Sequence, residues 1–185
     1  MNNLYIIDGW LKQARVVKSP NFNQRPENTS INAIIIHGIS LPPGQFGSSD
    51  IDDFFSNQLD VTKHPFYNQI ADLQVSAHFL IRRDGEIVQY VSTNERAWHA
   101  GVSRLAGKEN CNDFSIGIEL EGTDDSAYEL SQYKNLVAVI KCLIKEYPSI
   151  TKERIVGHEH VAPGRKTDPG PLFDWDLFWQ EINLN

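Results

Sequence analysis

The feature that most restricts the fold is a short apolar run, Ala33 to Ile36, inside the stretch INAIII at residues 31–36. A bilayer-spanning helix needs about 20 apolar residues, so this run is far too short to cross a membrane. An unbroken apolar run of this length is typical of a strand that is covered on both faces. We therefore predict a central buried strand, which requires further layers of structure on its two sides.

Further strands are predicted by local patterns. Residues 75–91 place two runs of strand-forming residues around Asp84-Gly85, a pair that favours a tight hairpin turn. The segment SIGIEL at 115–120 alternates strictly between large apolar residues and small or acidic residues, as a strand does. A third short strand is expected at 155–157.

Helices are indicated between these strands. Apolar residues recur at helical spacing over 130–147, and Pro148 ends the pattern. Asp174 is a suitable cap for a last helix, and a short helix is expected soon after residue 47. We predict an α/β fold, a mixed central β-sheet flanked by helices, in one domain over residues 1–185. Residues 1–30 and the loop at 157–170 are expected to be irregular.

Composition excludes several kinds of partner. The chain has 185 residues and a formal net charge of -7, which disfavours both nucleic acid and a polybasic contact with a membrane. The first ten residues lack the pattern of a secretory signal, so we expect a cytoplasmic protein. Two cysteines, Cys111 and Cys142, with no CxxC pair, fit a reducing compartment.

The segment GHEHVAPGRKTDPG at 157–170 carries most of the chemistry-bearing residues. Pro169 favours an extended backbone at Asp168, which would point Lys166 and Asp168 to the same side. Histidines near position 158 can meet them if the loop folds back, and His37 at the end of the buried strand could supply another ligand. Two histidines and one carboxylate with an open fourth position form a catalytic zinc pattern. The alternatives are a solvated loop with weak surface ion pairs and a His37 that only caps its strand.

Two other segments offer candidate site residues. In the 115–121 strand, Glu119 or Glu121 could act as a general base, although a polar, solvent-facing strand side explains the same alternation. In RAWHAG at 96–101, Trp98 and His99 could line a sugar- or peptide-binding cleft, although Trp98 could equally be a core residue.

Taken together, these segments closely resemble the N-acetylmuramoyl-L-alanine amidases, a family that shares its fold with peptidoglycan recognition proteins and phage amidases. Within that family the chain resembles the amidases of cytoplasmic peptidoglycan recycling, which hydrolyse the amide bond between 1,6-anhydro-N-acetylmuramic acid and L-Ala of the stem peptide. The resemblance runs in order through most of the chain. The matching segments are IIIHGISLPPGQFG, VSAHFLIRRDGEIVQYV, RAWHAG, CNDFSIGIELEGTD and GHEHVAPGRKTDPG.

The resemblance implies roles for individual residues. It places the Zn²⁺ ligands on His37, His158 and Asp168. The catalytic acid falls on Glu119 rather than Glu121, and the oxyanion-stabilising lysine falls on Lys166. We add three substrate contacts to these expectations: Trp98, His99 and Arg165. The expected partner is a small muropeptide, and we expect a monomer.

The chain departs from the family pattern at two positions. His160 stands where relatives usually carry an acidic residue, so it could compete with His158 as a ligand or change the surroundings of the metal. Gly38 stands where relatives often have Asn, which could contact substrate. A binding-only recognition module is disfavoured because all three ligand positions, Glu119 and Lys166 are present.

Overall fold

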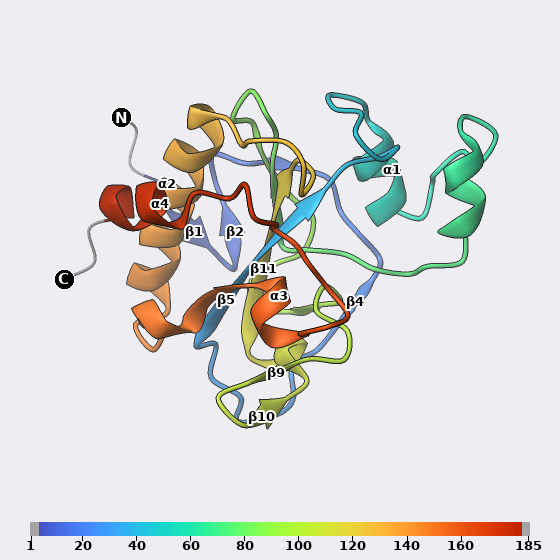
Figure 1. Ribbon diagram of the computed structural model, residues 1–185. Helices are drawn as coiled ribbons and strands as arrows, with labels where there is room; N and C mark the ends of the chain where they lie inside the picture. The colour runs from blue at the N-terminus through green and yellow to red at the C-terminus, as the bar shows by residue number, and fades with distance from the viewer. Residues whose placement is uncertain (1–3, 183–185) are drawn as a thin grey trace.

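A six-stranded mixed sheet forms the centre of the protein (Figure 1). The computed structural model describes residues 4–182. The sheet runs in the order β12-β5-β11-β6-β7-β3. Its strands are β3 (Arg15–Val16), β5 (Ala33–Ile39), β6 (Phe79–Ile81), β7 (Ile87–Gln89), β11 (Ser115–Glu121) and β12 (Ile155–Gly157). The first four strands in this order are parallel, whereas β7 is antiparallel to β6. The predicted central strand, hairpin and mixed sheet are confirmed.

Smaller elements surround this sheet. Three two-stranded ribbons pair β1 (Ile6–Ile7) with β2 (Trp10–Leu11), β4 (Phe22–Asn23) with β8 (Arg96–Ala97), and β9 (Arg104–Leu105) with β10 (Lys108–Glu109). The helices are α1 (Asp50–Phe55), α2 (Leu130–Glu146), α3 (His158–Val161) and α4 (Trp175–Ile182). Short 3₁₀ segments are η1 (Pro65–Gln69), η2 (Cys111–Asp113) and η3 (Lys152–Arg154). No helix within residues 4–182 has the length and apolar character needed to cross a bilayer.

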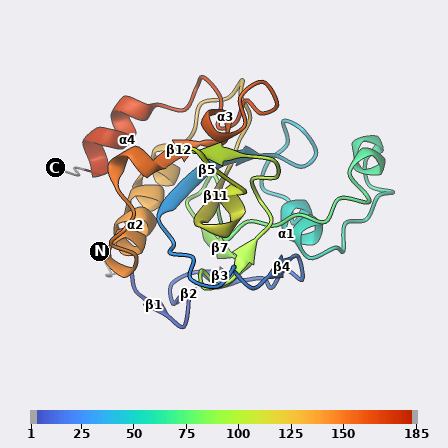
Figure 2. The same ribbon diagram turned by 90° about the horizontal axis from the view of Figure 1, so that it is seen from below.

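One face of the sheet is covered by α2 and α4, which lie side by side (Figure 2). Alternate residues of the two central strands, including Ile34 and Ile118, pack with Leu136, Ile140 and Phe178 of these helices. Each such side chain contributes about 2–3 kcal/mol when it is removed from water. Alternation along a strand then forces the next residues to the opposite face, where the polar side chains of β5 and β11 lie.

The first turn of α2 is tied to the sheet by one buried amide. The side chain of Gln132 donates to the carbonyl oxygens of Ile81 and Glu121, both at 3.1 Å. Its oxygen accepts from the backbone N–H of Glu129 at 3.0 Å, which caps the helix. At α4 the predicted cap is confirmed, because the Asp174 carboxylate accepts from the N–H of Leu177 at 2.9 Å.

Two predictions of irregular structure were wrong. Residues 4–30 contain four two-residue strands, and β3 joins the central sheet beside β7. Strands this short have no readable alternation. The 157–170 loop begins with a helical turn, α3, whose start is capped because His160 Nδ1 accepts from the N–H of Gly157 at 3.1 Å.

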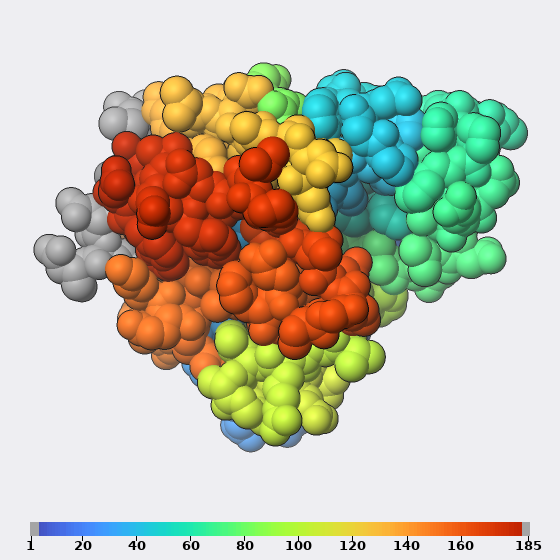
Figure 3. Space-filling view, in the orientation of Figure 1, coloured from blue at the N-terminus to red at the C-terminus, as the bar shows by residue number. Residues whose placement is uncertain are grey.

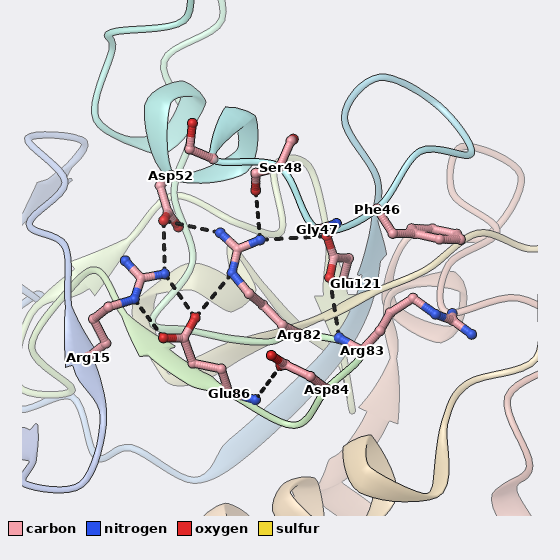
Figure 4. A pocket seen from close by; sticks show the side chains of 11 residues that line it. Arg15, Phe46, Gly47, Ser48, Asp52, Arg82, Arg83, Asp84, Glu86 and Glu121 are labelled. Atoms are coloured by element: carbon pink, nitrogen blue, oxygen red, sulfur yellow. Dashed lines mark hydrogen bonds and ion pairs between the residues drawn. The ribbon is translucent and has the colours of Figure 1, made fainter.

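An ion-pair cluster fastens α1 and the loop before it to the sheet (Figure 4). It borders a cavity of about 510 Å³. Asp52 on α1 lies 2.9 Å from the guanidinium of Arg15 and 3.1 Å from that of Arg82, and it accepts from the hydroxyl of Tyr90 at 2.5 Å. The arginine head groups already pair with carboxylates, so the cavity is not a site for an anion. The ion pairs around Asp52 instead form a structural clamp between α1 and the sheet.

The clamp matters because α1 forms one wall of a second hollow in the surface. Figure 3 shows this hollow bounded by the cyan segment near residue 45, the green segment near residue 65 and the orange segment near residue 165. Side chains from α1 and η1 line it, among them Phe54, Phe55 and Phe66. The position of this apolar wall therefore depends on Asp52 and its two arginines.

We predict that Asp52→Asn lowers the free energy of unfolding by about 2 kcal/mol, because Arg15 and Arg82 lose one of the two carboxylates that they share and keep only Glu86. Asp53→Asn is the matched control on the same helix. The Asp53 side chain is 31% exposed, compared with 12% for Asp52, so its loss should cost less than about 1 kcal/mol. Urea unfolding of both variants measures the difference, and equal losses would contradict the clamp.

A second prediction concerns His78, which is fully buried beside β11. Its Nδ1 accepts from the N–H of Gly117 at 3.0 Å, and its Nε2 lies 3.1 Å from the carbonyl oxygen of Glu95. Burial lowers the pKa of His78 from 6.5 to about 3, with the charge of Arg25 adding to the effect. Between these pH values the unfolded chain binds a proton that the folded chain does not bind, so stability is lost as the pH falls below 6.5.

The expected size of this loss is about 1.4 kcal/mol per pH unit for one histidine. Wild type should therefore lose about 2 kcal/mol more than His78→Gln between pH 7 and pH 5. Comparing the two proteins isolates His78 from the other buried titratable groups. Identical pH dependence in urea unfolding would show that protonation of His78 does not cause this loss of stability.

Candidate functional site

The register of the parallel strands brings the first candidate residues together. His37 on β5 lies directly opposite Glu119 on β11, and Gly157 at the end of β12 lies opposite Ile36. His158 follows Gly157 and therefore emerges beside His37. The carboxyl ends of parallel strands meet at one edge of a sheet, where α/β folds place their sites.

The loop after α3 folds back to this edge and brings Asp168 to the two histidines. The backbone N–H of Glu159 donates to the carbonyl oxygen of Asp168 at 3.0 Å, which closes the loop. Asp168 Oδ2 then lies 3.2 Å from His37 Nδ1 and 3.0 Å from His158 Nδ1. The two Nδ1 atoms are 3.0 Å apart. These three side chains could hold a metal ion.

The positions of the imidazole hydrogens in this group of three side chains favour a bound cation. His158 Nε2 lies 3.1 Å from the carbonyl oxygen of Ala100, which can only accept, so Nε2 carries the hydrogen. The Nδ1 of a neutral His158 therefore presents a lone pair to the Asp168 carboxylate. Two acceptors at this separation repel each other unless positive charge lies between them. Two imidazole nitrogens and one carboxylate oxygen form a ligand set that suits zinc.

Burial and the neighbouring rings set the charge state of the group. Burial lowers the pKa of His37 to about 4, so its imidazole is neutral at pH 7. Burial opposes ionisation of Asp168, but the two imidazoles next to its carboxylate outweigh this effect and hold its pKa well below the usual range. A neutral imidazole and an ionised carboxylate are the forms that bind a metal.

His160 lies outside this group. Its Nδ1 caps α3, its ring packs edge-on at 5.9 Å from that of Trp175, and it is exposed. A helical turn rotates the chain by about 100° per residue, so His158 and His160 point in different directions. The structure therefore brings His158, and not His160, to His37 and Asp168.

Glu119 is buried beside the group. Its exposed fraction is 8%, and within residues 4–182 its Oε2 has no hydrogen-bond partner. Burial raises the pKa of Glu119 well above its ordinary value, the charge of Asp168 adds to the rise, and the charge of Lys166 opposes it. A buried carboxylate oxygen without a partner is available to exchange a proton with a bound molecule.

Glu121 has a different task, although it lies on the same strand face. Its two carboxylate oxygens accept from the N–H groups of Gly47 at 2.6 Å and Arg83 at 3.2 Å (Figure 4). It thereby joins the loop before α1 to the hairpin turn. Both glutamates are buried, which excludes the alternative of a solvent-facing strand side. This side is covered by residues far away in the sequence, which the local alternation does not report.

A cleft of about 330 Å³ opens over the group. Its floor holds His37, Glu119, His158 and Asp168, and Lys166 stands at its rim with an exposed side chain. Lys166 and Asp168 therefore border the same space, as the extended backbone before Pro169 predicts. The opposite wall is apolar and is formed mainly by Phe54, Phe55, Phe66, Ile70 and Leu73. This wall could not be predicted from the sequence, because its residues come from segments without a recognisable motif.

The three expected substrate contacts have different positions. Trp98 is half-buried and lines the cleft, and its indole N–H donates to Asn23 Oδ1 at 2.7 Å. His99 also borders the cleft, but it is buried and lies 3.0 Å from His37. Arg165 is exposed, and its guanidinium donates to the carbonyl oxygens of Ala100 and Val102, both at 2.7 Å.

The space next to Gly38 is occupied by the side chain of Tyr128. An added Cβ at Gly38 would lie 2.5 Å from the hydroxyl oxygen of Tyr128. That hydroxyl donates to the carbonyl oxygen of Pro169 at 2.8 Å and so helps to hold the Asp168-Pro169 segment. A larger residue at position 38 would displace Tyr128.

Known proteins are similar to this chain in sequence. Residues 27–171 match the family described as N-acetylmuramoyl-L-alanine amidase. The chain is 56% identical over 177 residues to the 1,6-anhydro-N-acetylmuramyl-L-alanine amidase AmpD of Salmonella typhimurium, covering 96% of this chain and 94% of that protein.

Two solved structures are also similar. The crystal structure of a selenomethionine derivative of AmpD has a TM-score of 0.93 and 54% identity, over 96% of this chain and 98% of the other. The amidase AmiD of Escherichia coli, solved in complex with the substrate anhydro-N-acetylmuramic acid-L-Ala-D-γ-Glu-L-Lys, has a TM-score of 0.60 and 30% identity, over 98% of this chain and 66% of AmiD.

Proposed function

Because this chain belongs to the N-acetylmuramoyl-L-alanine amidase family, we propose that it hydrolyses the amide between 1,6-anhydro-N-acetylmuramic acid and L-Ala with the help of zinc. The observation that carries this proposal is the convergence of His37 Nδ1, His158 Nδ1 and Asp168 Oδ2 beside the buried Glu119. We assign the zinc to these three ligands. The reaction belongs to peptidoglycan recycling.

The choice of the anhydro sugar rests on the relatives. AmpD of Salmonella typhimurium is named for this substrate, and AmiD was solved with an anhydromuropeptide. The cleft offers an apolar wall on one side and the polar group with Lys166 on the other. Such a cleft suits a small molecule that joins a dehydrated sugar to a polar peptide.

Zinc, when bound here, supplies Lewis acidity that polarises the scissile carbonyl and makes a water molecule acidic near neutral pH. Glu119 takes the proton of the attacking water, because its unpartnered oxygen faces the same space and its raised pKa makes it a stronger base. The protonated Glu119 then hands a proton to the nitrogen of L-Ala, which leaves as an amine. The carboxylate is thereby restored.

Lys166 stabilises the negative charge that develops on the carbonyl oxygen. It stands at the rim of the cleft and carries a positive charge against a chain total of -7. Charge stabilisation of this kind is typically worth about 3 kcal/mol in kcat. Arg165 adds positive charge nearby, and Trp98 on the cleft wall contacts the substrate.

The setting that we propose is the cytoplasm, with the protein acting as a monomer on a small muropeptide. Cys111 and Cys142 are both free thiols, which fits a reducing compartment. The acidic chain is unsuited to nucleic acid or to an anionic membrane.

A cleavage assay tests the proposal. The purified protein is incubated with an anhydromuramyl tripeptide and, separately, with the same peptide on reducing-end N-acetylmuramic acid, and products are identified by mass spectrometry. Each reaction is repeated after chelation and after zinc is restored. Cleavage of the anhydro substrate alone, lost with chelator and recovered with zinc, is expected. Equal cleavage of both would contradict the anhydro preference, and zinc binding without cleavage would indicate a recognition module.

We predict that Glu119→Gln lowers kcat by at least about 100-fold while zinc stoichiometry stays at the wild-type value, since the amide cannot take the proton. His37→Ala should instead remove both zinc binding and turnover. Metal analysis and the cleavage assay separate the two effects. Near-normal turnover in Glu119→Gln would show that another group is the base.

Lys166→Ala should lower kcat by about 100- to 1,000-fold and leave zinc binding intact, because the lost charge acts on the transition state. The matched control is Lys145→Ala, which removes an exposed lysine from α2 and should leave kcat unchanged. A change confined to KM in Lys166→Ala would instead assign Lys166 to substrate binding alone.

A further inference from the structure

His99 occupies an unusual position for a residue that borders the cleft. Its ring lies edge-on to that of His37, with ring centroids 5.1 Å apart at an angle of 87°. Its Nδ1 is 3.0 Å from His37 Nε2, and its Nε2 is 3.3 Å from the hydroxyl oxygen of Ser115. Both ring nitrogens are therefore already engaged within the protein.

The space for this ring is provided by Gly117 on β11. A Cβ added at Gly117 would lie 2.4 Å from Cγ of His99, closer than two carbons can approach. The small residue in the SIGIEL alternation thus accommodates an imidazole of the protein itself. The room that the alternation suggested for a ligand is filled by His99.

The direction of each hydrogen bond in this group follows from one carbonyl. The hydroxyl of Ser115 lies 2.6 Å from the carbonyl oxygen of Cys111, which can only accept, so the single hydroxyl hydrogen is used there. Ser115 Oγ must then accept from His99 Nε2–H. A neutral imidazole with its hydrogen on Nε2 has a lone pair on Nδ1, so His99 accepts from His37 Nε2–H.

From this directed chain we propose that His99 and Ser115 are positioning residues that place the His37 proton on Nε2 and thereby leave Nδ1 free to bind the metal. The inference rests on the proposed function, because it assumes that His37 Nδ1 is a zinc ligand. Hydrogen bonds from the second nitrogen of a ligating imidazole fix its tautomer and orientation.

The same short segment orients the second histidine by a different means. The carbonyl oxygen of Ala100, the residue after His99, accepts from His158 Nε2–H at 3.1 Å. The side chain of Asn112 fixes both residues, because its Oδ1 accepts from the N–H of His99 at 3.1 Å and from that of Ala100 at 2.8 Å. Residues 99 and 100 therefore act together to orient His37 and His158 so that the Nδ1 atom of each faces Asp168.

Two substitutions at position 99 separate this role from simple packing. Asn and Leu have side chains of nearly the same shape, but only Asn has an oxygen where His99 has Nδ1. In His99→Asn the amide can present that oxygen to His37 Nε2–H, whereas His99→Leu offers no acceptor. Both variants leave the same unfilled space above Gly117, so packing affects them equally.

Zinc affinity, measured by competition with a chromophoric chelator, is the first readout. His99→Leu should bind zinc about 10- to 100-fold more weakly than wild type, because an outer-shell partner is lost. His99→Asn should stay within about threefold of wild type, because a neutral hydrogen bond replaces a neutral hydrogen bond. Equal losses in the two variants, or none in either, would overturn the role assigned to His99.

The tautomer of His37 in the metal-free protein is the second readout and needs no activity. Nitrogen-15 NMR of the imidazoles should show the His37 hydrogen on Nε2 in wild type and in His99→Asn. His99→Leu should show a mixture of tautomers at His37. Ser115→Ala is a milder variant that should release the tautomer of His99 without removing its ring, which keeps the test open if the His99 variants fold poorly.

These readouts distinguish failure of this inference from failure of the proposed function. If wild type binds zinc and hydrolyses the substrate but the His37 tautomer is the same in wild type, His99→Leu and Ser115→Ala, the positioning role is wrong and the amidase site stands. If wild type does not bind zinc, the metal site is wrong and the inference falls with it.

Discussion

The main constraint on this structure is that the lone pairs of three side-chain atoms point into one small volume. His37 Nδ1, His158 Nδ1 and Asp168 Oδ2 lie 3.0–3.2 Å from one another, at separations where acceptors repel. Interactions elsewhere in the chain hold these three atoms together. The β5–β11–β12 register fixes where two of the side chains leave the sheet, and the closed 159–168 loop brings the third. A divalent cation bound among them, as we propose, would turn this repulsion into coordination.

Covering both faces of the sheet serves the same end. With α2 and α4 on one face, the polar residues of β5 and β11 point into the other side, which α1, η1 and the 96–114 segment cover. Glu119 is consequently buried, and its Oε2 has no hydrogen-bond partner in the part of the chain that the structure describes, whereas Glu121 on the same face joins two loops. The clamp around Asp52 then fixes the apolar wall relative to the metal-binding group.

Local patterns predicted the elements that are long or that carry a strong period. The apolar run at 33–36, the Asp84-Gly85 turn and the helical spacing over 130–147 all correspond to observed elements. The short strands β3 and β4 could not be predicted, because their pairing partners β7 and β8 lie far along the chain. The strands β1 and β2 pair with each other, but two residues are too few to show an alternation. The same limit applies to Glu119 and Glu121, which share one alternation and differ only in which distant N–H groups reach them.

The choice between His158 and His160 has a similar origin. In an extended chain the two would point the same way, and both would be candidate ligands. The chain instead forms a helical turn at α3. His160 Nδ1 therefore caps the start of this turn, and the His160 ring packs against Trp175. The role that we propose for His99 could not be predicted either, because it depends on Ser115 and on the carbonyl of Cys111.

The most direct test of the central claim is a crystal structure of the zinc-soaked protein with anomalous data collected on both sides of the zinc absorption edge. We expect one edge-dependent peak bonded to Nδ1 of His37, Nδ1 of His158 and a carboxylate oxygen of Asp168. A peak coordinated by His160, or coordination of His37 through Nε2, would contradict the arrangement described.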